Sequence, residues 1–286
     1  MSNQKRERKR GIRGILILLF AVVFVISAAG LFKTLWQADR ENEAFEGLAS
    51  LVGPGGAGDE ETGSDSDLSD LNGLNGLNSG AVSVRDPEAP VSVTDYLNRD
   101  FSAVAEKNAD FAAWLAIPGT RVDYPVMMTP GDPQYYIRRD FYGEPSVSGC
   151  LFLGEGCTAD SGSMIIYGHN MKNGSMFGSL DNYKDGEFGK SHPYLVFSTL
   201  DGDRVYEIFA AFQTRIYKEG ENGFRYYQYT GDLTEEQFDE FVSQAKRISS
   251  YDTGVTPEYG EQLIMLSTCS YHTEDGRFVV AARRIE

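Results

Sequence analysis

Cys269 ends an apolar stretch and directly precedes a polar one. Residues 263–269 read LIMLSTC, which predicts a buried strand, and residues 270–276 are polar. A lone cysteine is more often a small buried packing residue than a nucleophile. This thiol lies where a predicted core strand emerges into a loop, so its reactivity depends on which side chains meet it there.

Two other residues have comparable positions at strand ends. His169 follows the apolar residues 164–167 and Gly168, whose backbone is free to turn. Arg277 lies eight residues after Cys269, so a hairpin would return it beside the cysteine. Each alone reads as an ordinary strand-end residue. Together they supply a nucleophile, a proton carrier and a cation that stabilises charge on oxygen, which predicts a cysteine acyl-transfer site.

The elements that would position these residues are mainly strands. Short apolar segments recur along the C-terminal two thirds of the chain, separated by Gly, Pro, Asp and Asn. Eight such segments predict a mainly β domain, either a β-barrel or a β-sandwich. We expect strands at residues 111–117, 122–127, 150–153, 163–167, 194–198, 204–213, 262–267 and 277–283.

Two helices are expected beside the strands. A short one is predicted over residues 101–107, with Asp100 as its N-cap. A longer one begins at Thr234, which forms a capping-box pattern with Gln237. Its apolar face recurs at helical spacing, and its opposite face is charged, so it should pack on the strands and take no part in chemistry. The apolar face comprises Phe238, Phe241, Val242, Ala245 and Ile248.

Charge and cysteine content exclude several kinds of function. Six of the 26 basic residues precede position 14 and are opposed only by Glu7, so the rest of the chain carries a net charge of −21. Such an acidic body repels phosphate backbones, which argues against nucleic acid as a partner. The chain has three cysteines and three histidines, and their scattered positions do not match the spacing of metal ligands. No metal and no cofactor are expected. Cys150 and Cys157 bracket a predicted strand, too far apart to form a disulfide.

An apolar, uncharged stretch at residues 14–32 is long enough to span a bilayer. The basic residues 1–13 precede it, so the positive-inside rule predicts a cytoplasmic tail, a single-pass anchor in the cell membrane and an extracellular catalytic domain. A cleaved signal peptide is the alternative, because Ser27, Ala28 and Ala29 offer a cleavage site. The apolar run is longer than a signal core, which favours the anchor.

Residues 33–92 are expected to form a juxtamembrane segment and a flexible linker. From about residue 50 the composition shifts to Gly, Ser, Asp and Asn, with a short Leu-Asn-Gly repeat and clustered acidic residues. Such a segment cannot bury enough apolar surface to order itself, and as a random coil it would span roughly 35–40 Å. Residues 93–286 then form the catalytic domain.

The sequence resembles the class B sortases, a family of cysteine transpeptidases, over nearly all of residues 93–286. The tract YGHNM with the following MFGSL resembles the histidine motif of the family, and LSTC followed by RFVVA resembles its cysteine and arginine strands. The segment DYPV, a tyrosine pair and the late helix also fit. These tracts occupy residues 167–171 and 176–180, 266–269 and 277–281, 123–126 and 135–136.

The resemblance implies a sortase-type closed β-barrel of about eight strands, with an N-terminal helix and an additional amphipathic helix late in the domain. His169, Cys269 and Arg277 would be the catalytic residues, and Ser267 and Thr268 would line the peptide groove. His272, three residues past the cysteine, is a less suitable base than His169. A residue so close to Cys269, on a loop that extends away from its strand, usually directs its side chain away from the thiol. Cys150 stands where family members often have serine.

The implied reaction has two substrates. Surface proteins bearing a C-terminal sorting signal would be cleaved after a threonine, and the thioacyl intermediate would pass to an amine of a peptidoglycan precursor or a pilin. Two alternatives stay open at this point. One is a hydrolytic cysteine peptidase, because sequence does not separate water from an amine as acceptor. The other is an inactive sortase-like binding domain, which the joint presence of Cys, His and Arg disfavours.

Overall fold

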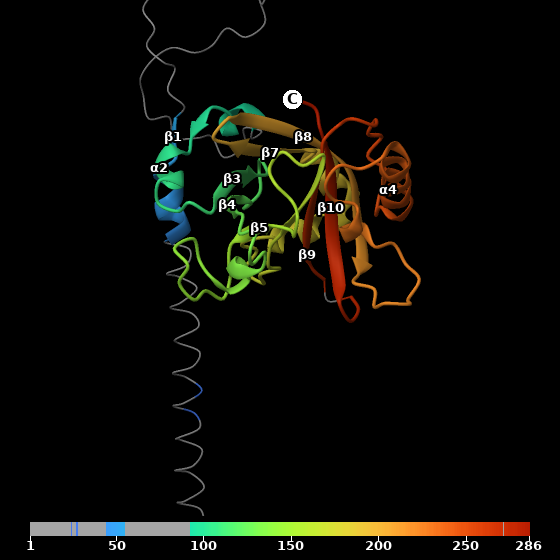
Figure 1. The fold of residues 1–286 in the computed structure, drawn as a ribbon, viewed down its shortest axis with the longest axis horizontal. Helices are drawn as coiled ribbons and strands as arrows, with labels where there is room; N and C mark the ends of the chain where they lie inside the picture. The colour runs from blue at the N-terminus through green and yellow to red at the C-terminus, as the bar shows by residue number, and fades with distance from the viewer. Residues whose placement is uncertain (1–23, 25–26, 28–43, 55–91, 271) are drawn as a thin grey trace, which may run out of the picture.

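Eight strands close into a barrel in the order β10-β8-β7-β3-β4-β5-β6-β9 (Figure 1). This computed structural model describes residues 24, 27, 44–54, 92–270 and 272–286. All eight predicted strands are present and the closed β-barrel is confirmed. The strands are β3 Phe111–Ala116, β4 Asp123–Met127, β5 Leu151–Leu153, β6 Ser163–Tyr167, β7 Tyr194–Thr199, β8 Gly202–Arg215, β9 Leu263–Cys269 and β10 Gly276–Arg284.

Strand direction in the barrel follows from the connections. A two-residue turn joins β7 to β8, a six-residue connection joins β9 to β10, and both pairs are antiparallel. The pairs β4–β5 and β6–β9 are parallel, and each is joined by a long excursion, as parallel neighbours require. The excursion between β6 and β9 contains β7, β8 and the long helix α4, Glu235–Ile248. Residues of β6 and β9 therefore become neighbours although they are 100 positions apart.

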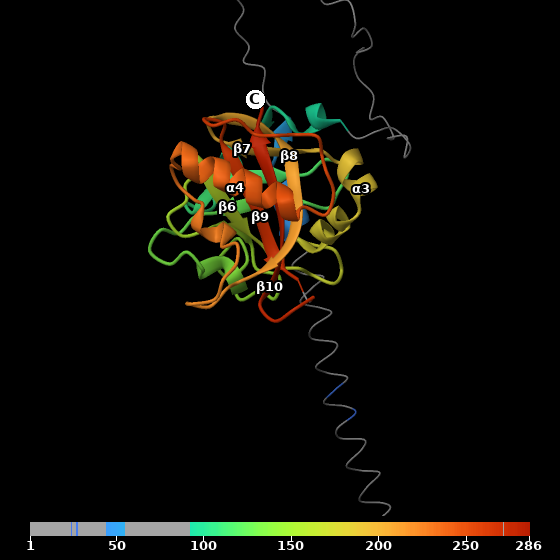
Figure 2. The same cartoon turned by 90° about the vertical axis from the view of Figure 1, so that its right-hand side faces the viewer.

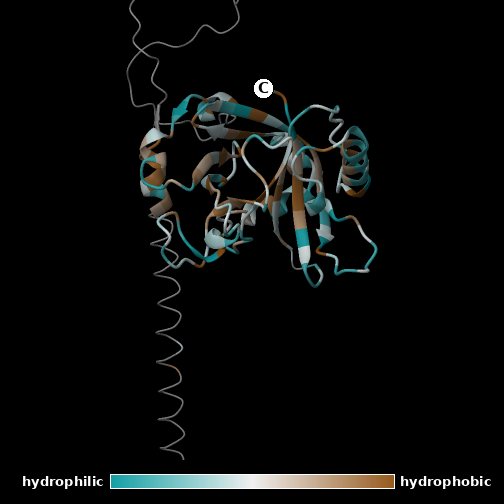
Figure 3. Ribbon diagram, viewed as in Figure 1, coloured by the Kyte–Doolittle hydropathy of each residue, from teal (hydrophilic) through white to brown (hydrophobic). Residues whose placement is uncertain are grey.

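The hydrophobic core around the strands contains large aromatic side chains. Trp114, Phe197, Phe212 and Phe278 are among the fully buried ones, and apolar residues concentrate along the strands while loops are polar (Figure 3). Strands β6 and β9 are buried over most of their length, so they carry continuous apolar runs in place of alternation. This pattern is what made both strands recognisable in the sequence.

Helix α4, Glu235–Ile248, lies across the outside of the barrel (Figure 2). The predicted capping box is present, with Thr234 Oγ1 accepting from the backbone of Gln237 and the Gln237 side chain accepting from the backbone of Thr234. Phe241 makes an edge-on ring contact with Phe209 of β8, at a centroid distance of 6.3 Å. The predicted packing role of this helix is confirmed.

Shorter helices lie at the ends of the barrel. The helix predicted over residues 101–107 is confirmed in position but is shorter, and Asp100 lies one residue before its N-cap Phe101 while accepting from the backbone of Ser102. Single-turn helices were not predicted, because they lack a repeating apolar face. The helices are η1 Val93–Tyr96, α2 Ser102–Ala105, η2 Tyr135–Arg138, η3 Gly178–Lys184, α3 Gly186–Ser191 and η4 Tyr226–Gln228.

Residues 44–54 pack against the domain. A helical turn over residues 44–49 buries Phe45 and Leu48, and the Phe45 ring meets Tyr124 of β4 edge-on at 5.3 Å. Strand β1, Gly53–Pro54, then pairs antiparallel with β2, Arg99–Asp100. This small sheet brings residues 53–54 beside residues 99–100.

Among the described residues, none of the helices is both long and apolar enough to cross a bilayer. The predicted anchor, residues 14–32, lies outside the described residues except for Phe24 and Ser27, and the predicted cytoplasmic tail, residues 1–13, lies outside them entirely.

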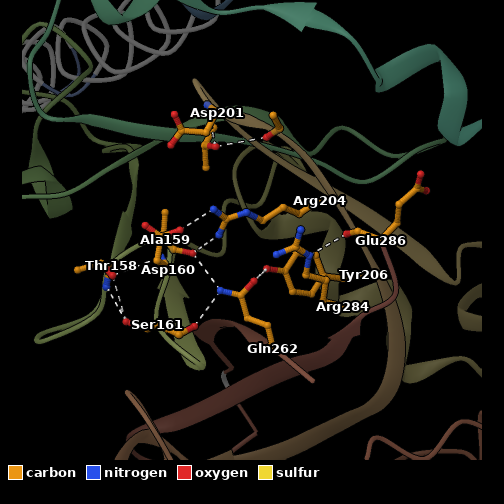
Figure 4. Close-up of polar contacts among 12 residues, drawn as sticks. Thr158, Ala159, Asp160, Ser161, Asp201, Arg204, Tyr206, Gln262, Arg284 and Glu286 are labelled. Carbon is orange, nitrogen blue, oxygen red and sulfur yellow. Dashed lines mark hydrogen bonds and ion pairs between the residues drawn. The ribbon is translucent and has the colours of Figure 1, made fainter. Parts of the chain in front are cut away.

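A polar network fixes the connection between β5 and β6 at the end of the barrel where β9 begins (Figure 4). Gln262 donates from Nε2 to the carbonyls of Ala159 and Ser161, at 3.0 and 2.9 Å, and accepts from the Tyr206 hydroxyl at 2.7 Å. Arg204 pairs with Asp160 at 2.6 Å. Strand β9 runs from this end of the barrel to Cys269. The network therefore holds the start of β9, at the opposite end of the strand from Cys269.

Candidate active site

Arg277 lies directly opposite Cys269 on neighbouring strands. The antiparallel register of β9 and β10 pairs these two residues, at the lower end of the barrel in Figure 1. Directly opposed residues of an antiparallel pair point to the same face, with Cβ atoms roughly 4.5–5.5 Å apart. The hairpin expected from the spacing of eight residues therefore places Arg277 beside Cys269.

His169 reaches the same place from the other side of β9. The parallel register of β6 and β9 pairs Tyr167 with Ser267, and both chains continue two residues further, to His169 and to Cys269. Neighbouring strands are about 4.8 Å apart, and alternation puts residues i and i+2 on one face. Cys269 thus lies between Arg277 of β10 and the segment that continues β6 to His169, and all three residues line one cavity.

The position of Gly168, directly after β6, has no room for a larger side chain. A Cβ atom at this position would lie 2.5 Å from Leu151 Cδ2 and 2.7 Å from Phe177 Cδ2, well inside contact distance. Its backbone nitrogen donates to the Ser267 carbonyl at 3.2 Å. The glycine therefore permits close packing behind His169, which is a stricter requirement than the freedom to turn inferred from the sequence.

One cavity of about 540 Å³ contains all five predicted site residues in its walls. Cys269 is exposed, whereas Cys150 and Cys157 are buried, and none of the three forms a disulfide. The long connection between β4 and β5 supplies a wall that the sequence analysis did not identify. The lining residues from that connection are Asp132, Pro133, Gln134, Ile137 and Cys150, and those from elsewhere include Glu155, Tyr167, His169, Ser267, Thr268, Cys269 and Arg277.

The imidazole of His169 is oriented by a backbone carbonyl. Its Nε2 lies 2.7 Å from the Ile137 oxygen. Since a carbonyl only accepts hydrogen bonds, Nε2 carries the proton in this arrangement, and Nδ1 is the nitrogen whose lone pair is available in the neutral ring. Burial lowers the pKa of His169 below its usual value, and the charge of Arg138 acts in the same direction, while the bond to Ile137 opposes them.

The guanidinium of Arg277 is held by its own turn. Nη1 donates to the carbonyls of Gly276 at 2.9 Å and Asp275 at 3.3 Å. Among the residues described, no carboxylate lies within ion-pair distance of it. The positive charge is therefore not cancelled by a nearby anion and acts on the cavity that the side chain lines.

The two residues before the cysteine use their hydroxyls within the protein. Ser267 shares a 2.8 Å hydrogen bond with the buried Tyr226 hydroxyl, and Thr268 donates from Oγ1 to the Gly168 carbonyl at 2.8 Å. Both residues line the cavity but are almost fully buried. These bonds couple β9 to β6 and to the segment around η4, which the sequence did not reveal because the partners are distant along the chain.

His272, the second candidate base, bonds within its own loop. Its Nδ1 lies 3.0 Å from the Ser270 hydroxyl, and it is not among the lining residues of the cavity. Within the described parts of the chain, no group of three or more His, Cys, Asp and Glu side chains is arranged to hold a metal ion. The thiol, imidazole and guanidinium that line the cavity are the groups needed for thiol attack, proton transfer and stabilisation of an oxyanion.

Comparisons with known proteins agree on one family. A family model described as the sortase domain matches residues 115–285. A curated sortase B of Listeria monocytogenes is 30% identical over 209 residues, which cover 72% of this chain and 81% of the relative. A crystal structure of sortase B from B. anthracis superposes with a TM-score of 0.56 at 29% identity, covering 70% of this chain and 90% of that one. Sortase B of Staphylococcus aureus gives 0.58 at 25% identity, covering 65% and 86%.

Proposed function

This chain belongs to the sortase family, whose members are cysteine transpeptidases, and we propose that Cys269, His169 and Arg277 are the groups with which it transfers acyl groups. The class B members are the relatives it resembles. The observation that carries the assignment is the strand register, which sets the cysteine between the histidine and the arginine at the mouth of one cavity.

In the first half of the reaction, a C-terminal sorting signal of a surface protein lies in the cavity. The Cys269 sulfur attacks the backbone carbonyl carbon of a threonine, and the negative charge that develops on its oxygen is stabilised by the Arg277 guanidinium. His169 takes the proton of the Cys269 thiol as the sulfur attacks, and it delivers that proton to the departing amine when the carbon–nitrogen bond breaks. The surface protein is then joined to Cys269 as a thioester, and the C-terminal fragment leaves.

In the second half, an amine of a peptidoglycan precursor or a pilin attacks the thioester. His169 takes the proton that the amine loses, an amide bond forms, and the thiol of Cys269 is released. Atoms balance without a cofactor, because one amide bond is exchanged for another. Ser267 and Thr268 support the groove through their bonds to Tyr226 and Gly168, which fix the strand that carries the nucleophile.

The proposed place of action is outside the cell. The basic tail at residues 1–13 followed by the apolar residues 14–32 supports a single-pass anchor with the N-terminus in the cytoplasm. The catalytic domain would then face the cell wall, where both substrates are found. Protease treatment of intact cells tests this orientation, since it should degrade residues 93–286 and spare an N-terminal tag.

The nucleophile is tested with Cys269→Ala in the full chain. We expect cleavage of peptides from a sorting-signal library to be abolished while the melting temperature stays close to that of the parent protein, because the side chain is exposed. Cys157→Ala is the matched control, since this cysteine lies outside the cavity lining and should leave cleavage intact. Full turnover by Cys269→Ala would remove the assignment. Product analysis with and without an added amine separates transfer from hydrolysis.

A further inference from the structure

The side chain of Asn170 is bonded to the main chain of Cys269. Its Nδ2 donates to the Cys269 carbonyl oxygen at 2.9 Å. In the parallel ladder of β6 and β9, the Gly168 nitrogen donates to the Ser267 carbonyl, so the next rung would join the nitrogen of residue 170 to the carbonyl of residue 269. A side-chain amide makes this rung in place of the backbone.

The backbone of Asn170 is not available for that rung because the chain has already turned away. Asn170 forms an isolated antiparallel bridge with Met176, a residue at φ 50°. The loop between them is tightly closed, since a Cβ at Gly178 would lie 2.2 Å from the Met171 carbonyl oxygen. The histidine loop thus leaves the barrel at residue 170, and the amide is its last link to the strand that carries the thiol.

A second acceptor fixes the orientation of this amide. Nδ2 also lies 3.2 Å from Asp181 Oδ2, on the helical turn η3. The other oxygen of Asp181 is paired with Lys184 Nζ at 2.8 Å. An amide nitrogen has two hydrogens, so the carbonyl and the carboxylate together use both, and the nitrogen end must face Cys269. Asp181 therefore fixes the orientation of the Asn170 amide.

We infer that Asn170 is a positioning residue, which fixes the peptide group of Cys269 relative to the adjacent His169. The inference rests on the proposed roles of those two residues. Asn170 directly follows the histidine, and it grips the carbonyl of the cysteine itself, so one side chain sets the separation between imidazole and thiol. Aspartate has the right length but no hydrogen to donate when ionised, and glutamine places its amide one methylene too far.

The test compares Asn170→Ala with the parent protein in the full chain. Loss of the link should lower kcat for donor-peptide cleavage by about 10- to 100-fold, since displacements of about 1 Å between reacting groups cost up to 10²-fold. The donor KM should change little, because Asn170 is not among the residues that line the donor cavity. Asn170→Asp should be impaired at least as strongly.

Asn173→Ala is the matched control. This asparagine lies in the same loop and bonds to Ser175, but the structure gives it no bond to β9. We expect it to keep near-parental kcat. Equal losses in the two alanine variants, or a kcat for Asn170→Ala within about twofold of the parent, would overturn the inference by reducing Asn170 to a general loop residue.

A second readout requires no sorting substrate. The rate at which iodoacetamide alkylates Cys269, followed between about pH 5 and pH 9, reports how the thiol is coupled to its neighbours. Asn170→Ala should change this pH profile, and Asn173→Ala should reproduce the parental one. An unchanged profile in Asn170→Ala would contradict a positioning role. A different result would show that the proposed function is wrong, namely peptide cleavage that survives in Cys269→Ala.

Discussion

At the scale of single residues, the site depends on how His169 is held between the barrel and the solvent. Its Nε2 is engaged by the Ile137 carbonyl, and burial lowers its pKa, so the resting ring is neutral at neutral pH. The sequence identified this histidine through its place after an apolar strand. It gave no indication of Ile137, because that residue lies on the β4–β5 connection and meets the ring only when the barrel closes.

The lowered pKa of His169 predicts a loss of stability in mild acid. The unfolded chain binds a proton near the ordinary pKa of 6.5, whereas the folded chain resists protonation at this position. Between the two pKa values the unfolded state binds more protons, so the free energy of unfolding falls as the pH drops below about 6.5. His169→Gln removes this step.

Thermal melts at pH 7.5 and at pH 5 measure the effect. The drop in melting temperature between the two should be smaller in His169→Gln than in the parent chain, while the carboxylates that titrate in the same range contribute equally to both. Parallel pH dependence in the two proteins would contradict the prediction and mean that the ring gains a proton as readily in the folded state as in the unfolded one.

At the scale of elements, a strand or helix could be predicted where neighbouring residues in the sequence determine it. Continuous apolar runs identified β6 and β9, and the Thr234–Gln237 pattern identified the start of α4. Register is set by partners far along the chain, so the pairing of Tyr167 with Ser267 was not readable. Asn170 was visible beside His169 in the YGHNM tract, but its bond to Cys269 depends on that register.

The capping box of α4 makes a measurable contribution to stability. Thr234→Ala leaves a backbone donor at the helix start without its side-chain partner, which should cost about 1 kcal/mol and lower the melting temperature by roughly 2–4 °C. Ser243→Ala, on the exposed face of the same helix, should cost nothing. Donor cleavage should be unchanged in both variants, because α4 packs on β8 away from the cavity. A neutral Thr234→Ala in chemical denaturation would contradict the role of the cap.

At the scale of the whole molecule, the docked segment 44–54 changes how the acidic region 55–91 functions. Composition alone predicted a linker whose length sets the reach of the domain. The pairing of β1 with β2 and the burial of Leu48 place residues 44–54 against the domain that begins at residue 92. The length of residues 55–91 therefore does not separate the catalytic domain from residues 44–54, and reach from the predicted anchor would be set by residues 33–43.

Shortening residues 55–91 to about a quarter of their length with a Gly/Ser connection should therefore leave the enzyme folded and active. Each halving of a flexible loop lowers its closure cost by about 0.6 kcal/mol, so two halvings should stabilise the docked arrangement by about 1.2 kcal/mol. The same deletion in a Leu48→Asp chain, where docking is broken, should give no such gain, because the loop is then no longer closed. Denaturant unfolding measures the gain, and peptide cleavage measures activity. A destabilised or inactive shortened chain would mean that residues 55–91 contribute contacts of their own.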